Sequence, residues 1–315
     1  MALNKNIRKT LAALLTVCII PAACCFSMTA FGSDSDSTEA YTQSLDDVRI
    51  SYLGPEGTYT EEAAQSFFST GTFQPKETVP EAIADLADGD ADYAVIPQEN
   101  TLGGAVTDYV DALIAETGVY VVGEVVLPIN QTLMGLPDAS IEDIQTVCSH
   151  AQGLKQSAEW RKEHLPDAVT EEMASTAAAA SYVAESGDKT IAAIAAPGAA
   201  KLYGLSVLAE NVQITDANKT RFYVLSSSRP EEEGQTNAVL LASCEANRLD
   251  DIIVEIHDTG VELVTIHDRP EGSQLGAYNY IIEVENESGM SGELIEKLEN
   301  IPEIHFLGSF NVILK

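Results

Sequence analysis

Residues 218–225 read Asn218-Lys219-Thr220-Arg221-Phe222-Tyr223-Val224-Leu225. The second half, from Phe222 to Leu225, is apolar and rich in β-prone residues, so we predict a buried strand there. A hydroxyl and a guanidinium, those of Thr220 and Arg221, stand just ahead of this strand. Arginine is seldom buried without a partner. Arg221 therefore needs an anion, which is either a carboxylate of the protein or a ligand.

The chain before this strand alternates between β and α patterns from about residue 49 onward. We expect strands at 50–53, 93–96, 119–127, 146–148 and 190–195, and helices at 58–68, 81–87, 106–115, 177–180 and 198–203. Such an order predicts an α/β fold in which helices cover parallel or mixed sheets.

Several of these helices begin with hydroxyl or amide residues directly after a strand. The starts are Thr58, Asn100-Thr101, Ser149-His150 and Ser175-Thr176. The pairs Thr58/Glu61 and Ser149/Gln152 have the spacing of a capping box, and each start taken alone is explained as a helix cap. In open α/β sheets, however, helix N-termini meet at the carboxyl ends of the strands. Because each N-terminus carries free N–H groups and partial positive charge, we expect them to converge, with Arg221, on a small anionic ligand.

The composition limits the classes of partner. The formal net charge is −32, which argues against nucleic acid and anionic membranes as ligands. Beyond the first 32 residues the chain keeps two cysteines, Cys148 and Cys244, and its five histidines are scattered. We therefore predict neither a disulfide framework nor a metal site.

Residues 1–32 have the pattern of an export signal. Basic residues at 5, 8 and 9 precede an apolar run at 11–20, and small residues follow as far as Gly32. Residues 33–47 are rich in Ser, Asp and Thr and are predicted to form a disordered tether. We expect a periplasmic or extracellular protein. Lipidation at Cys24 and an uncleaved membrane anchor are the alternatives.

Five blocks of the sequence together resemble the prephenate dehydratase family. They are Tyr52-Leu53-Gly54-Pro55-Glu56-Gly57-Thr58-Tyr59, Glu99-Asn100-Thr101 with Gly104, Ser149-His150, Ser175-Thr176-Ala177 and Asn218 to Phe222. The resemblance covers about residues 49–228. It implies a dehydratase domain at 48–228 with the two α/β lobes of a type II periplasmic binding protein. Lobe 1 is expected at 48–126 plus 208–228, and lobe 2 at 127–207.

The resemblance also implies an activity and a set of site residues. The family converts prephenate to phenylpyruvate, carbon dioxide and water, and needs no cofactor. Thr220 matches the family's catalytic position. The positions matching the substrate cleft are Asn100, Thr101, Ser149, His150, Ser175, Thr176 and Arg221. We also expect Thr58 to contact the substrate as a helix start, and Phe222 to provide a less polar place for the ring carboxylate, because desolvation favours its loss. Two residues depart from the family pattern: Ala151 stands in place of a proline, and Gln98 in place of a branched aliphatic residue.

Residues 229–236 are predicted to form a hinge, and residues 237–315 have the βαββαβ pattern of a ferredoxin-like module. This module resembles the ACT regulatory domain of bacterial dehydratases, which implies a homodimer or homotetramer. Gly260, Val261, Arg269 and Pro270 match positions that help bind phenylalanine in the family. His267-Asp268 replace its Glu-Ser pair, which puts feedback regulation in doubt.

Three other functions are compatible with the same sequence. The substrate could be arogenate, the amino counterpart of prephenate. The chain could instead be an exported binding protein that has lost turnover, or a sensor that uses the C-terminal module. The intact Thr220-Arg221-Phe222 stretch favours an enzyme, because a pure binding protein has no need of the Thr220 hydroxyl.

Overall fold

The computed structural model describes residues 48–116, 118–230 and 234–315. The predicted signal (1–32) and tether (33–47) lie outside these ranges, as does part of the predicted hinge. No helix within the described ranges is long and apolar enough to cross a membrane.

The first sheet contains the strand from which the sequence analysis started. Its seven strands are β1 (Arg49–Leu53), β2 (Thr72–Lys76), β3 (Tyr93–Asn100), β4 (Gly104–Ala105), β5 (Tyr120–Pro128), β11 (Lys219–Ser226) and β16 (Val312–Leu314). The order is β16-β5-β11-β3-β1-β2, with β4 paired to β3. The sheet is mixed, because β11 runs antiparallel to both of its neighbours while β1 pairs in parallel with β2 and β3.

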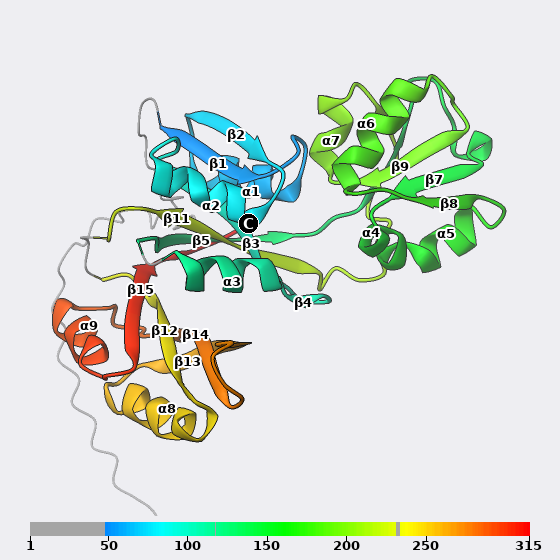
Figure 1. Cartoon of the computed structure of the whole chain (residues 1–315). Coiled ribbons are helices and arrows are strands. Elements are labelled where there is room, and N and C mark those ends of the chain that lie inside the picture. Colours follow the sequence, from blue (N-terminus) through cyan, green and yellow to red (C-terminus); the bar gives the residue numbers. More distant parts are fainter. Residues whose placement is uncertain (1–47, 117, 231–233) are drawn as a thin grey trace, which may run out of the picture. The chain divides into compact units, whose positions relative to one another are not determined.

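Helices α1 (Tyr59–Phe67), α2 (Val79–Asp88) and α3 (Thr107–Ala115) pack on this sheet (Figure 1). Alternate residues of β11 are buried in different clusters: Phe222 and Val224 with α1, and Tyr223 and Leu225 with α2 and α3. A strand that is covered on both faces reads as a continuous apolar run, which explains the pattern in the sequence.

The second sheet has the order β10-β6-β9-β7-β8. Its strands are β6 (Thr132–Gly135), β7 (Thr146–Ser149), β8 (Val169–Glu172), β9 (Ile191–Ala195) and β10 (Ser206–Ala209). Its helices are α4 (Ala151–Gln156), α5 (Ala158–His164), α6 (Thr176–Ser186) and α7 (Pro197–Leu202). The small side chains of α6 and β9 are buried in one cluster, where alanine allows the helix to approach the sheet closely.

The third sheet, together with two helices, forms the ferredoxin-like module. It comprises β12 (Asn237–Glu245), α8 (Leu249–Asp258), β13 (Glu262–Pro270), β14 (Ala277–Glu285), α9 (Gly292–Glu299) and β15 (Ile304–Phe310), with the strand order β13-β14-β12-β15. Short 3₁₀ turns occupy Ile141–Asp143 and Ala246–Arg248. The predicted βαββαβ order is confirmed.

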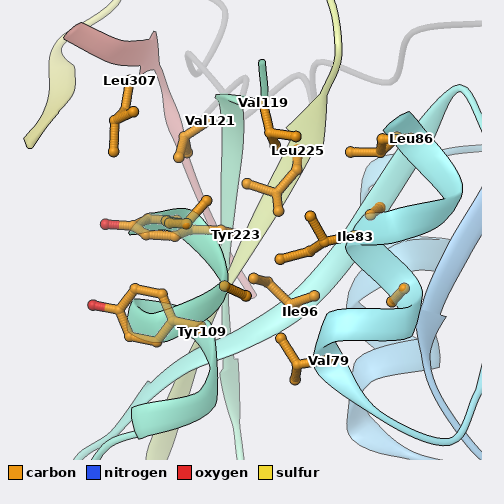
Figure 2. Close-up of a cluster of buried hydrophobic side chains, with 14 of the residues drawn as sticks. Val79, Ile83, Leu86, Ile96, Tyr109, Val119, Val121, Tyr223, Leu225 and Leu307 are labelled. Carbon is orange, nitrogen blue, oxygen red and sulfur yellow. The ribbon is translucent and has the colours of Figure 1, made fainter. Parts of the chain in front are cut away.

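The end of the chain differs from the βαββαβ pattern predicted for residues 237–315, which would keep the last β segment within the module. After β15 the chain leaves the third sheet, and β16 pairs in parallel with β5 of the first sheet. A shared hydrophobic core accompanies this crossing. Tyr109, Val121 and Tyr223 are buried in the same cluster as Leu307 and Phe310 (Figure 2). The third sheet is therefore attached through buried apolar surface as well as through the chain itself.

Gly308 lies at a close approach between β15 and β5. Its φ is 132°, and a Cβ added there would overlap the carbonyl oxygen of Val121. We expect Gly308→Ala to lower the free energy of unfolding by at least about 2 kcal/mol, measured by urea denaturation. Gly276→Ala is the matched control, because Gly276 has a φ of 92° but no atom within 4 Å of the added Cβ. Equal losses in the two variants would contradict a role for the close approach.

Candidate active site

A cleft of about 390 Å³ opens between residues of the first and second sheets, and its volume falls in the range of small-molecule sites. Six of the predicted site residues line it: Thr58, Asn100, His150, Ser175, Thr176 and Thr220. They come from the segment before α1, from β3 and β11, and from the starts of α4 and α6. Side chains from five parts of the sequence therefore meet in one cavity.

Asn100 organises the floor of the cleft. Its Oδ1 accepts hydrogen bonds from the backbone N–H groups of Leu102 (3.1 Å) and Gly103 (2.9 Å). Backbone N–H groups can only donate, so the amide orientation is fixed and Nδ2 must be the donor. Nδ2 lies 2.9 Å from Thr220 Oγ1 and 2.8 Å from Asn218 Oδ1. Asn100 thus joins the end of β3 to the start of β11.

The Thr220 hydroxyl is consequently free to act as a donor. Its oxygen accepts from Asn100, and the described part of the chain shows no acceptor for its proton. The residue is 8% exposed and lines the cleft. A buried hydroxyl with an unused proton can donate to a bound molecule.

Of the helices of eight residues or more that begin at the cleft, α1 and α6 are capped by a hydroxyl side chain, whereas α3 follows Val106 and has no side-chain cap. Thr58 caps α1, with its Oγ1 accepting from the Glu61 N–H, as the capping-box spacing predicted. Ser175 caps α6, with its Oγ accepting from the Ala178 N–H at 3.0 Å. Both helices direct the positive ends of their dipoles at the cleft, which favours an anionic ligand.

His150 caps α4, where the sequence had favoured Ser149. Its Nδ1 accepts from the Gln152 N–H at 3.3 Å, so the neutral ring carries its proton on Nε2. Among the described lining residues there is no Asp, Glu, Lys or Arg, although the chain has 49 acidic residues. The positive potential on the cleft wall therefore comes from the helix N-termini, and His150 adds a neutral N–H donor at Nε2.

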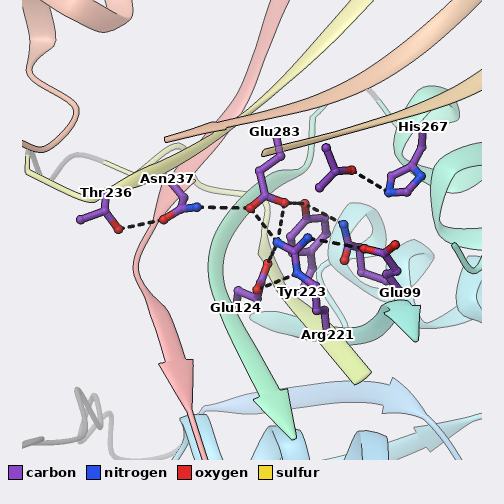
Figure 3. A network of polar contacts seen from close by, with 10 residues as sticks. Glu99, Glu124, Arg221, Tyr223, Thr236, Asn237, His267 and Glu283 are labelled. Carbon is purple, nitrogen blue, oxygen red and sulfur yellow. Dashed lines mark hydrogen bonds and ion pairs between the residues drawn. The ribbon is translucent and has the colours of Figure 1, made fainter. Parts of the chain in front are cut away.

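Arg221 does not line the cleft, so the prediction that its guanidinium binds the ligand there is wrong. Its Nε and Nη2 donate to Glu124 at 2.9 and 2.5 Å, and Nη2 also lies 2.6 Å from both oxygens of Glu283 (Figure 3). Successive residues of a strand point to opposite faces, so Arg221 turns away from the cleft that Thr220 faces. The sequence left open whether the anion that pairs with Arg221 is a ligand or a protein carboxylate, and the structure shows two protein carboxylates.

Three other predicted residues also lie away from the cleft. Ser149 is fully buried, and its hydroxyl donates to the Ile194 carbonyl at 2.6 Å. Thr101 Oγ1 donates to the Ala217 carbonyl and accepts from the Lys219 N–H, so it ties the loop to β11. Phe222 packs in the cluster beneath α1. Each of these side chains supports the frame of the site.

Sequence reasoning missed three glutamines that line the cleft: Gln131, Gln152 and Gln156. Gln152 Nε2 donates to Asn100 Oδ1 (3.1 Å), and Gln131 Nε2 donates to Gln156 Oε1 (3.0 Å). Gln152 and Gln156 are four residues apart on α4, and this spacing could have placed both on one face. Gln131 precedes β6, and only tertiary contacts bring it to the site.

Comparisons with known proteins identify the family of this chain. The prephenate dehydratase family model matches residues 50–230. The chain belongs to the prephenate dehydratase family.

Two relatives are similar over most of the chain. A prephenate dehydratase of Amycolatopsis methanolica is 33% identical, over 83% of this chain and 88% of its own. A bifunctional chorismate mutase/prephenate dehydratase of Neisseria gonorrhoeae is 35% identical over 75% of this chain, which spans 66% of that protein. The crystal structure of an Arthrobacter aurescens prephenate dehydratase in complex with L-Phe superposes with a TM-score of 0.74. It is 30% identical, over 84% of this chain and 90% of that one.

The four residues that the sequence analysis matched to the family's phenylalanine-binding positions lie in the ferredoxin-like module, in β13 or just before it. Arg269 pairs through two hydrogen bonds with Asp111 of α3, and Pro270 ends β13. Gly260 has a φ of 99°, and Val261 is buried in the core of the module. His267 contacts Tyr109 edge-on, and burial lowers the pKa of its ring.

The buried carboxyl of Glu124 makes the free energy of unfolding depend on pH. Burial raises its pKa to about 7, against the hydrogen bonds from Arg221; the Glu283 charge acts in the same direction as burial. In the unfolded chain its pKa is near 4.5, so the folded state binds more protons between about pH 4.5 and 7. Stability therefore falls as pH rises through this window, by up to about 3 kcal/mol.

We expect urea unfolding between pH 5 and 8 to show this slope in the wild type and not in Glu124→Gln. The exposed Glu285→Gln is the control and should keep the wild-type slope. Identical slopes in the wild type and Glu124→Gln would contradict the assignment. Glu99 and His267 also face the cluster, and they are unchanged in both variants.

Proposed function

We propose that the chain catalyses the decarboxylative dehydration of prephenate to phenylpyruvate, as a carbon–oxygen lyase that needs no cofactor. The observation that carries this proposal is the Thr220 hydroxyl. Asn100 fixes its oxygen as an acceptor, which leaves its proton directed at a cleft of suitable size. Family membership supplies the reaction, and this geometry supplies a group able to perform its difficult step.

The cleft suits a dianion with one leaving hydroxyl. The backbone N–H groups at the starts of α1 and α6, beside Thr58 and Ser175, would hold the side-chain carboxylate of prephenate. The apolar lining at Leu53, Pro97 and Ile129 is the environment that favours loss of the ring carboxylate, because desolvation destabilises that charge. Phe222, proposed from the sequence for this role, is too deeply buried to reach it.

The chemical step consumes one proton. The bond between the ring and the hydroxyl breaks, and its electron pair leaves with the oxygen. The ring carboxylate leaves as carbon dioxide, and the electron pair of the broken carbon–carbon bond stays in the ring and makes it aromatic. Thr220 donates its proton to the departing hydroxide, which becomes water. The threonine is then reprotonated by solvent, either directly or through His150 Nε2, which regains its own proton from solvent. Donation that strengthens only as charge develops lowers the barrier.

The cleft favours prephenate over arogenate. Arogenate carries an ammonium group, and the described lining residues include no carboxylate to pair with it. A keto group needs only hydrogen-bond donors, which Gln131, Gln152 and Gln156 provide. Competition between the two substrates, followed as kcat/KM, would check this preference.

The direct test incubates the purified full chain with prephenate and follows the absorbance of phenylpyruvate in base. Steady formation of phenylpyruvate above the spontaneous rate supports the enzyme. Calorimetric binding of prephenate without any product would instead identify the chain as a binding protein. Absence of both would reject the cleft as a prephenate site.

We further propose that the third sheet is an ACT domain and that it binds phenylalanine. Its strand order and the L-Phe in the Arthrobacter relative support this. Arg269 is already paired with Asp111, so binding that uses Arg269 would compete with this contact. A thermal shift with phenylalanine tests the proposal by linkage, and no shift at millimolar ligand would end it.

Export and self-association complete the proposal. The basic and apolar segments of residues 1–32 support export, and cleavage after residue 32 can be read by mass spectrometry of the secreted chain.

Val254, Leu263 and Val264 are exposed apolar side chains on α8 and on the edge strand β13, which supports a homodimer or homotetramer. Analytical ultracentrifugation would decide between a monomer and these assemblies.

A further inference from the structure

Glu283 of the third sheet is bound to the strand that carries Thr220. Both of its carboxylate oxygens lie 2.6 Å from Arg221 Nη2. Oε2 also accepts from the Tyr223 hydroxyl at 2.9 Å, and Oε1 accepts from Asn237 Nδ2 at 3.2 Å. Figure 3 shows these groups converging on one carboxylate. Glu283 is 1% exposed, so water cannot substitute for these partners.

The two partners on β11 follow Thr220 closely in the strand. Arg221 directly follows Thr220, and Tyr223 lies two residues further on, on the same face as Arg221. The pairing of β11 with β3 is irregular between Arg221 and Phe222, opposite Gln98. On its other side β11 pairs regularly with β5 from Lys219 to Val224, so the irregularity is confined to the β3 side of the strand.

Gln98 strengthens the same connection from the other side. Its side chain is fully buried, and its Nε2 donates to the Tyr223 hydroxyl at 3.3 Å. Gln98 stands where the family resemblance led us to expect a branched aliphatic residue, which could not make this bond. The polar chain from Gln98 through Tyr223 to Glu283 therefore starts at a residue that departs from the family pattern.

The charges make Glu283 more than a packing residue. Arg221 forms ion pairs with Glu124 and Glu283, whose side chains are each 2% exposed. Its Nη1 also lies 3.7 Å from Glu99 Oε2. Hydrogen bonds between ionised groups are short and directional. Glu124 holds Arg221 from the neighbouring strand of the same sheet, whereas Glu283 holds it from another sheet. The guanidinium is thus fixed from two directions.

We propose that Glu283 is a positioning residue for the dehydratase reaction: through Arg221 and Tyr223 it holds β11 so that the Thr220 hydroxyl keeps its contact with Asn100 and its direction into the cleft. The inference rests on the proposed function. It makes the third sheet part of the catalytic apparatus, and a displacement of β14 would reach Thr220 through one intervening residue.

The test uses the full chain with Glu283→Gln, which keeps the side-chain shape and removes the charge. We expect kcat for prephenate to fall about tenfold, with KM within twofold of the wild type, because the substrate contacts are intact while Thr220 is misplaced. The matched control is Glu285→Gln on the same strand, which is exposed and should leave both parameters unchanged. Rates are taken per active site, counted by calorimetric binding of phenylpyruvate.

A purely structural role would lower the melting temperature and the number of active sites, but not the rate per site. A kcat per site within twofold of the wild type in folded Glu283→Gln would overturn the proposal. If Glu283→Gln does not fold, Tyr223→Phe replaces it, and a two- to fivefold loss of kcat per site is expected; no loss would overturn the proposal. Lack of turnover by the wild type itself would overturn the proposed function, and the inference with it.

Discussion

Replacing Thr220 by valine is expected to lower kcat for prephenate at least about 100-fold, with little change in KM. Valine keeps the shape of threonine and its β-branched fit in β11, but it has no hydroxyl. The side-chain carboxylate of the substrate would still meet the helix starts at Thr58 and Ser175, so binding should persist. What disappears is the donor to the departing hydroxide, which acts mainly in the transition state.

The measurement is steady-state formation of phenylpyruvate, with Thr220→Ser as the matched control. Serine restores the hydroxyl beside Asn100 Nδ2, so we expect Thr220→Ser to recover most of the lost rate. Thr220→Val with near-normal turnover would remove Thr220 from the chemistry. A large rise in KM with unchanged kcat would assign the residue to substrate binding instead.

Replacing Arg221 by methionine is expected to lower the free energy of unfolding by about 3–5 kcal/mol. The variant leaves the carboxylates of Glu124 and Glu283 buried without their shared cation. Arg229→Met is the control, because the Arg229–Glu299 pair is exposed and such pairs contribute less than about 1 kcal/mol. Urea unfolding at one pH compares the two.

The same cluster offers a rescue experiment. Adding Glu124→Gln and Glu283→Gln to Arg221→Met removes the stranded charges, so part of the lost stability should return. If Arg221→Met is as stable as the wild type, the carboxylates are reached by water and the closed network is wrong. If the triple variant recovers nothing, the loss came from packing of the arginine stem.

Local features of the site could be predicted from the sequence, because capping depends on neighbours in the chain. Thr58 and Ser175 cap their helices as expected. Ser149 has the same spacing from Gln152 but does not cap. It is the last residue of β7, and its hydroxyl is taken by the Ile194 carbonyl, which lies 45 residues away in the sequence. That carbonyl reaches Ser149 only in the folded protein.

The partners of Arg221 could not be predicted for a similar reason. Glu124 and Glu283 are 97 and 62 residues away, in a chain with 49 acidic residues. The sequence predicted that Arg221 has an anionic partner, but it could not identify which residue that partner is. The exposed edge strand β8 was missed because it has no buried face to impose an alternating pattern. The pairing of β16 with the first sheet could not be predicted, because β-propensity does not specify a pairing partner.

The most direct test of the account is a crystal structure of Thr220→Val with prephenate bound, since this variant should bind the substrate and turn it over slowly. We predict that the ring hydroxyl lies against residue 220 and Asn100, and that the side-chain carboxylate lies at the start of α1 or α6. Prephenate bound elsewhere, or in the cleft with its hydroxyl turned away from residue 220, would contradict the proposed chemistry.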